Sequence, residues 1–131
     1  HQFIYPHLAV GEVVISDRYL DSSLAYQGAA RGLTVADVAE LSGWATENLV
    51  PDLTIVLDVD PRRGLARAQD GNRMESEAMA FHDAVRGAFL ALAGREPHRY
   101  LVLDADQPIN VIAEAVWTAV SERLLDLAGP R

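Results

Sequence analysis

An aspartate and an arginine stand together directly after a short apolar run near the start of the chain. The run covers residues 13–16, and Asp17 and Arg18 follow it. A carboxylate at the end of a buried strand suits a magnesium ion, and a planar guanidinium matches the oxygens of a phosphate. An aspartate in this position is also a common turn or capping residue, so the pattern alone leaves both interpretations open.

The next residues add polar groups of another kind. Hydroxyl, phenol and amide side chains follow within about two helical turns of the arginine, namely Ser22, Ser23, Tyr26 and Gln27. Hydroxyl and amide groups can read the polar edge of a base, and a tyrosine ring can pack against a sugar. The alternative is a helix capped by Ser22 or Ser23, with Tyr26 in the core.

Three apolar runs are expected to form the strands that position such groups. They cover residues 13–16, 53–57 and 100–103, and an aspartate follows each run. Each run is almost continuously apolar, which is typical of parallel strands that are covered on both faces. Ligands of such sheets bind outside the carboxyl ends of the strands, so the residues after the runs are the first candidates for a site.

Helical patterns separate the strands. They cover residues 34–49, a helix opened by Asp60 and Pro61, residues 75–93, and a helix after Pro108. Their apolar residues recur at helical spacing, and proline at a first helical position after an aspartate is a helix-start signal. Strands alternating with helices predict a doubly wound parallel α/β sheet. No linker or repeat interrupts the chain, so residues 1–131 are expected to form a single domain.

One stretch of the chain is specific enough to indicate a family. Residues 17–28, Asp-Arg-Tyr-Leu-Asp-Ser-Ser-Leu-Ala-Tyr-Gln-Gly, closely resemble the signature of the thymidylate kinases. Further stretches resemble the family in order and spacing, at residues 51–54, 64–67, 72–75, 81–86 and 103–105, with Asn72 in place of the usual aspartate. The resemblance implies a P-loop kinase-type sheet, with an acceptor site at about residues 13–33 and a lid at about residues 67–75.

The resemblance also implies roles at the acceptor, dTMP. Asp17 would help to hold Mg²⁺ near the transferred phosphate, and Arg18 would grip the phosphate of dTMP. Ser23 and Gln27 would lie at the thymine. Tyr26 would pack against the deoxyribose, where it could crowd out a ribose 2′-hydroxyl.

At the donor, ATP, the resemblance implies a second group of residues. Arg67 would stack on the adenine, and the loop containing Asp104, Ala105 and Gln107 would border the same base. Arg73 would reach from the lid to the phosphates as a catalytic residue beside Asp17 and Arg18. Arginines and magnesium would offset the repulsion between two phosphates that must meet.

A phosphate-binding Gly-x-x-x-x-Gly-Lys-Ser/Thr loop does not occur in the 131 residues. In the family, the strand before that loop stands between the strands that correspond to residues 13–16 and 53–57. We therefore expect the chain to be the C-terminal part of such a kinase, with a gap in its sheet, and to be inactive alone. The alternatives are another nucleoside or nucleotide kinase, or a relic that binds nucleotides without catalysis.

The amino-acid composition argues against several other classes of protein and of site. A formal net charge of −8 argues against nucleic acid as a partner. The chain has no cysteine and four scattered histidines, which excludes a disulfide framework and makes a zinc site improbable. No apolar run approaches the length of a membrane span. We expect a cytoplasmic protein with no membrane partner, and the resemblance implies a homodimer.

Overall fold

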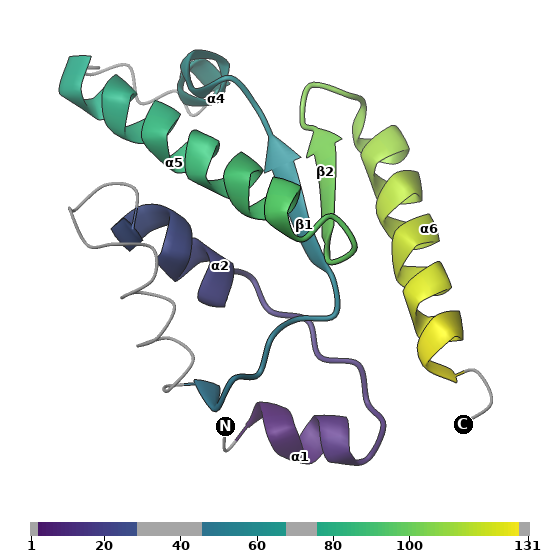
Figure 1. The fold of residues 1–131 in the computed structure, drawn as a ribbon. Coiled ribbons are helices and arrows are strands. Elements are labelled where there is room, and N and C mark those ends of the chain that lie inside the picture. The colour runs from purple at the N-terminus through teal and green to yellow at the C-terminus, as the bar shows by residue number, and fades with distance from the viewer. Residues whose placement is uncertain (1–2, 29–45, 68–75, 129–131) are drawn as a thin grey trace. The chain divides into compact units, whose positions relative to one another are not determined.

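The computed structural model describes residues 3–28, 46–67 and 76–128. The chain divides into two compact units, residues 1–50 and residues 51–131 (Figure 1). The described part of the first unit is helical, whereas the second unit combines helices with a parallel sheet. The chain is therefore of the α/β class, as the sequence predicts.

The first unit begins with helix α1, Ile4–Ala9, which ends where Gly11 takes a φ of 81°. That left-handed conformation is easy for glycine and commonly ends helices. Helix α2, Leu20–Ser23, continues directly into the π-helical segment η1, Leu24–Gly28. Their buried side is formed by Asp21, Leu24 and Ala25. The sequence offers a helix capped by Ser22 or Ser23 here only as an alternative, and the observed helix begins earlier, at Leu20 after Tyr19, without a side-chain cap.

The strand predicted over residues 13–16 is not formed, and this prediction is wrong. These residues are irregular, and Val13 and Ile15 are 58% and 92% exposed. A strand is stabilised by pairing with a neighbour, and the described residues of this unit contain no other strand. Three predicted strands therefore become two in the part of the chain that the structure describes.

The second unit is built around two parallel strands, β1, Thr54–Asp58, and β2, Tyr100–Asp104. Thr54 pairs with Tyr100 and Asp58 with Asp104, so both strands end in an aspartate at the same edge. Both strands lie where the sequence predicts them. The strands are less buried than predicted: Leu57 is 54% exposed and Val102 is 41% exposed. A sheet of two strands is too narrow for its side chains to be fully buried on both faces.

Helix α4, Pro61–Arg67, begins as its sequence predicts. The Asp60 carboxylate accepts a hydrogen bond from the backbone N–H of Arg62 at 2.8 Å. The Asp60 carbonyl accepts the first helical bonds, from the N–H groups of Arg63 and Gly64. An aspartate at the cap and a proline in the next position explain why the helix starts here. This cap fixes where the arginines of α4 stand relative to the end of β1.

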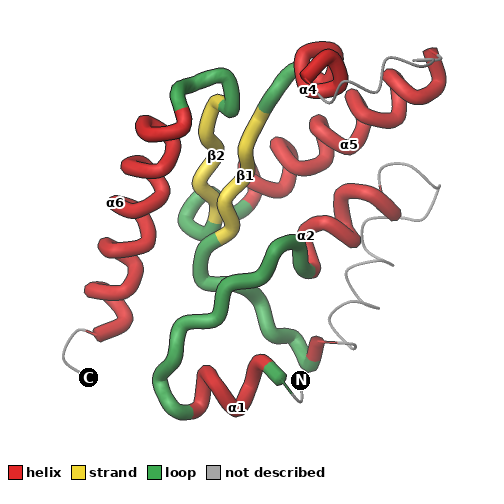
Figure 2. Tube along the Cα trace, turned by 180° about the vertical axis from the view of Figure 1, so that it is seen from behind, coloured by secondary structure: helices red, strands yellow, loops and turns green. Residues whose placement is uncertain are grey.

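Two long helices cover the sheet. Helix α5, Ser76–Arg95, and helix α6, Ile109–Ala128, both contact β2 and lie on opposite sides of it (Figure 1 and Figure 2). The core of this unit includes Val85, Leu92 and Tyr100. Both helices lie where the apolar periodicity predicts them, within about two residues.

The predicted helix over residues 34–49 and the lid at residues 67–75 lie largely outside the described residues. Arg73 lies outside them too. In the part of the chain that the structure describes, no helix is both long and apolar enough to cross a bilayer.

Candidate functional site

The predicted acceptor residues of the first unit begin at a bend in the backbone. Arg18 has a φ of 65°, in the left-handed region that side chains rarely adopt. The Ser16 hydroxyl donates a hydrogen bond to the Arg18 carbonyl at 2.9 Å and so supports this conformation. Strained backbone of this kind is found at ligand sites more often than elsewhere. The bend therefore marks Arg18 as a candidate independently of any motif.

The bend brings the guanidinium of Arg18 over the ring of Tyr26. The Arg18 Cζ atom lies 5.2 Å from the ring centroid, which is within the range of a cation–π interaction. Arg18 is exposed and Tyr26 is half-buried. A cation, an aromatic face and the exposed Asp17 thus lie within one short segment. This arrangement can hold an anion beside the face of a ring or sugar.

The remaining predicted acceptor residues, Ser23 and Gln27, belong to the helical segments that follow. Ala25 is fully buried and Asp21 is 4% exposed, whereas Ser23 is half-buried. Gln27 belongs to the π-helical segment η1, and such segments occur frequently at functional sites. The sequence-based assignment gives Asp21 no role. Its low exposure is the first indication that this side chain contributes to the fold.

At the carboxyl edge of the sheet, Asp58 is held by Arg86 of α5. The Arg86 Nε and Nη2 atoms donate to the two carboxylate oxygens of Asp58 at 2.6 and 2.8 Å. This bidentate contact lowers the pKa of Asp58, against a smaller opposing effect of burial, and raises the pKa of Arg86. The pair joins the end of β1 to α5. Sequence reasoning assigned no role to Arg86, because its partner lies 28 residues away.

The loop after β2 is folded by Asp104. One carboxylate oxygen accepts the backbone N–H of Asp106 at 2.8 Å, and the other accepts Nε2 of Gln107 at 3.3 Å. These hydrogen bonds lower the pKa of Asp104. The N–H of Ala105 donates to the Asp58 carbonyl at 2.8 Å, which ties the loop to the neighbouring strand. Hydrogen bonds from their backbone N–H groups therefore fix Ala105 and Asp106, the first two residues of the loop.

Arg67 of α4 contacts this loop directly. Its Nη1 atom donates to the Ala105 carbonyl at 3.2 Å, and its Nη2 atom bonds the Asp106 carboxylate. The resemblance implied that Arg67 and the loop containing Asp104, Ala105 and Gln107 border the same base, and the structure places these residues together in one unit. Asp106, which lies in the loop Asp104 to Gln107 but received no role of its own from the resemblance, links them.

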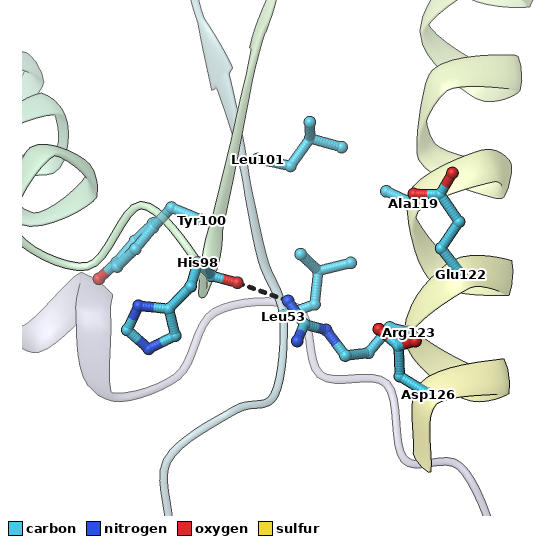
Figure 3. A pocket seen from close by; sticks show the side chains of 8 residues that line it. All are labelled: Leu53, His98, Tyr100, Leu101, Ala119, Glu122, Arg123 and Asp126. Atoms are coloured by element: carbon cyan, nitrogen blue, oxygen red, sulfur yellow. Dashed lines mark hydrogen bonds between the residues drawn. The ribbon is translucent and has the colours of Figure 1, made fainter. Parts of the chain in front are cut away.

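A pocket lies at the opposite end of the same sheet, between the strands and the C-terminal half of α6 (Figure 3). The residues that line it are Leu53, His98, Tyr100, Leu101, Ala119, Glu122, Arg123 and Asp126. Arg123 donates to the His98 carbonyl across it. Ligands of parallel sheets bind at the carboxyl ends of the strands, so this pocket at the amino ends is not our candidate site.

The chain is similar to known proteins over most of its length. The family model for thymidylate kinase matches residues 1–116. The chain belongs to the thymidylate kinase family. It is 50% identical over 119 residues to a thymidylate kinase of Clavibacter michiganensis subsp. michiganensis, which covers 88% of the chain and 56% of the relative. It is 51% identical over 128 residues to one of Bifidobacterium longum strain DJO10A, covering 95% of the chain and 59% of the relative.

A thymidylate kinase of Deinococcus radiodurans is 46% identical over 125 residues, covering 93% of the chain and 61% of the relative. The chain thus spans about three fifths of the length of the thymidylate kinases that it matches. The family match includes both the Arg18–Tyr26 segment and the Arg67–loop contact, since both lie within residues 1–116. Both therefore lie in the part of the chain that matches the thymidylate kinase family.

The Asp58–Arg86 pair predicts an acid dependence of stability. The pKa of Asp58 is lowered in the folded chain from an ordinary value of 3.8. The stabilisation is therefore complete above the ordinary value and is lost as the pH falls through the lower folded value. We expect Asp58→Asn to reduce the free energy of unfolding at pH 7 by about 1–3 kcal/mol. The difference between the variant and the parent should shrink as the pH falls below the ordinary carboxyl pKa of 3.8.

Urea unfolding of the 131-residue chain at pH 7, 5, 4 and 3 measures this difference. Asp52→Asn is the matched control, because Asp52 is an exposed carboxylate just before β1. A difference between Asp58→Asn and the parent that is as large at pH 3 as at pH 7 would contradict an ionised Asp58 as its source.

Proposed function

We propose that this chain contributes the acceptor and donor-base sites of an enzyme that phosphorylates dTMP to dTDP with ATP in the cytoplasm. An oxygen of the dTMP phosphate bonds to the γ-phosphorus of ATP, the bond from that phosphorus to the β,γ-bridging oxygen breaks, and ADP leaves. The observation that carries the proposal is the placement of the Arg18 guanidinium 5.2 Å over the Tyr26 ring, beside Asp17, in a chain of the thymidylate kinase family. A phosphate and a nucleoside need these two groups side by side.

Arg18 binds and orients the acceptor phosphate. Its fork of donors matches two phosphate oxygens, and the fixed backbone at φ 65° limits the directions that the side chain can take. Tyr26 packs against the deoxyribose, and Ser23 and Gln27 contact the thymine. The cation–π contact keeps the guanidinium near the sugar-facing ring, so the phosphate and the sugar are positioned together.

Magnesium fits the acceptor side through Asp17. Mg²⁺ keeps several water ligands and takes one or two carboxylates together with substrate phosphates, so a single exposed carboxylate is a sufficient protein ligand. Among the described residues, no group of three His, Cys, Asp or Glu side chains could hold a metal ion by itself. When bound, the ion neutralises charge on the phosphates.

Arg67 and the loop containing Asp104, Ala105 and Gln107 bind the adenine of ATP. Their direct contacts support a common role, because a base stacked on the guanidinium would also border the loop. Arg73 reaches the phosphates and offsets charge during transfer, an assignment that rests on the family resemblance alone. The enzyme is proposed to act as a homodimer without nucleic acid or membrane partners, with the net charge of −8 opposing nucleic-acid binding.

A chimaera tests this function. In it, the 131-residue chain replaces the matching stretch of the Bifidobacterium longum thymidylate kinase. Formation of ADP and dTDP is followed, with the unaltered relative as control. We expect transfer to dTMP that needs Mg²⁺ and exceeds transfer to AMP or CMP. The prediction that the chain alone is inactive stays a prediction, which the same assay on the chain tests.

The two alternatives give other outcomes. A different nucleotide kinase would phosphorylate AMP or CMP as well as dTMP. A relic that binds without catalysis would leave the chimaera folded and able to bind dTMP but inactive. Either result would overturn the proposed function.

A further inference from the structure

Asp106 lies between two arginines of α4. Its carboxylate bonds Nη2 of Arg67 through one oxygen and Nη1 of Arg63 through the other, the latter at 2.5 Å. The Asp106 side chain is 20% exposed, whereas those of Arg63 and Arg67 are 62% and 52% exposed. Two exposed, flexible side chains are thus anchored on one largely covered carboxylate. None of the acceptor or donor assignments above uses Asp106 or Arg63.

The contacts of Arg67 fix the plane of its guanidinium. One terminal nitrogen donates to the Ala105 carbonyl at 3.2 Å, and the other bonds Asp106. Hydrogen bonds of a guanidinium lie in its plane, so these two contacts leave its flat faces free. They also engage both terminal nitrogens, so the Nη1–Nη2 edge is not available to a phosphate. A guanidinium held in this way is prepared to stack on a ring and is poorly placed to grip an anion.

We propose that Asp106 is a positioning residue that holds the Arg67 guanidinium edge-on to the loop, so that one flat face receives the purine of the donor nucleotide. This inference rests on the proposed function, because it takes Arg67 to be the residue that contacts the donor base. Beyond that function, the inference identifies the carboxylate that orients Arg67 and the purine as the part of the nucleotide that Arg67 contacts. Loss of the Asp106 carboxylate should weaken donor binding without changing the binding of dTMP.

The loop itself does not depend on the Asp106 side chain. Its fold is maintained by the Asp104 carboxylate, which accepts the backbone N–H of Asp106, and by the Asp58 carbonyl, which accepts the N–H of Ala105. Asparagine at position 106 keeps that N–H and nearly the same shape, and it removes the charge and replaces one of the two acceptor oxygens with an NH2 donor. Asp106→Asn therefore separates the orientation of Arg67 from the fold of the loop.

The orientation is measured first on the 131-residue chain, without any ligand. A guanidinium held at both terminal nitrogens rotates slowly about its Nε–Cζ bond and gives separate Nη proton signals in NMR spectra, and Arg67→Met assigns them. We expect these signals to merge in Asp106→Asn and to stay separate in Arg62→Met. Arg62 is an exposed arginine of the same helix. Unchanged Arg67 signals in Asp106→Asn would overturn the proposal.

The consequence for the donor is measured in the chimaera. We expect Arg67→Met to raise the KM for ATP about 5- to 50-fold and Asp106→Asn about 3- to 30-fold, with little change in the KM for dTMP. Asp106→Glu should recover part of the loss, since it keeps the carboxylate. The double variant should resemble Arg67→Met alone, because Asp106 acts through Arg67.

The possible failures are distinct. A parent chimaera without transfer to dTMP contradicts the proposed function, while the NMR result still decides whether Asp106 orients Arg67. The parent chimaera can instead be active, with a KM for ATP that is raised by Arg67→Met but not by Asp106→Asn. That result contradicts only the inference about Asp106. Effects of the two variants that multiply in the double variant would also contradict it, because they would then act independently.

Discussion

In the chimaera, Arg18→Ala is expected to raise the KM for dTMP by about 10- to 150-fold and to leave the KM for ATP nearly unchanged. The reason is the loss of a charge-assisted, bidentate contact to phosphate, worth about 1.5–3 kcal/mol. Arg18→Lys recovers only part of the loss, since an ammonium cannot offer two parallel donors or stack on the Tyr26 ring in the same way. Steady-state kinetics with each substrate varied in turn measure this split.

The backbone at Arg18 makes this comparison clean. A φ of 65° is unfavourable for any residue with a Cβ atom, so alanine, lysine and arginine carry a similar cost there. Differences between these variants therefore report the side chain. Arg95→Met, which removes an exposed arginine at the end of α5, is the control for loss of positive charge. An unchanged KM for dTMP in Arg18→Ala would refute the role of Arg18.

Local signals in the sequence located much of the second unit. The start of α4 followed from an aspartate and a proline in adjacent positions, and the Asp60 carboxylate forms the expected cap. The strands β1 and β2 followed from short apolar runs, each with an aspartate at its end. These features depend on neighbours within about four residues, so a single sequence contains the information that determines them.

Pairings over long distances were not accessible in this way. Asp58 and Arg86 are 28 residues apart, and Arg67 and Asp106 are 39 apart. Nothing in the sequence says which of several charged residues will meet across two elements. The strand predicted at residues 13–16 failed for a related reason, since an apolar run becomes a strand only where a neighbour pairs with it. The motif around Arg18 identified the family, but only coordinates could place its guanidinium over Tyr26.

Arg99 makes further contacts that could not be predicted from the sequence, and these contacts bear on stability. Arginine is usually exposed, and the sequence offers no sign that this one is only 5% exposed. Its Nε donates to Glu96 at 2.9 Å, its Nη1 to the Thr54 hydroxyl at 3.1 Å, and its Nη2 to the Tyr100 hydroxyl at 3.0 Å. The same guanidinium lies 4.4 Å from the Tyr100 ring centroid. It thus joins the end of α5 to the first residues of both strands.

We expect Arg99→Met to lower the free energy of unfolding of the 131-residue chain by about 2–4 kcal/mol. Replacing both partners of a buried ion pair with apolar residues is often neutral, but this variant removes one partner and leaves three polar groups that have lost a donor. Glu96 is 44% exposed and can turn to water, which keeps the expected loss below that of a fully buried pair. Urea unfolding followed by circular dichroism measures the change.

Two further variants separate the sources of that loss. Arg99→Lys keeps the charge but not the geometry of the fork, so its destabilisation should fall between those of the parent and Arg99→Met. Arg95→Met removes an exposed arginine four residues earlier on α5 and should change stability by no more than about 1 kcal/mol. If Arg99→Met were as stable as Arg95→Met, the hydrogen bonds of Arg99 would contribute nothing net, and packing of α5 and the strands alone would hold this end of the sheet together.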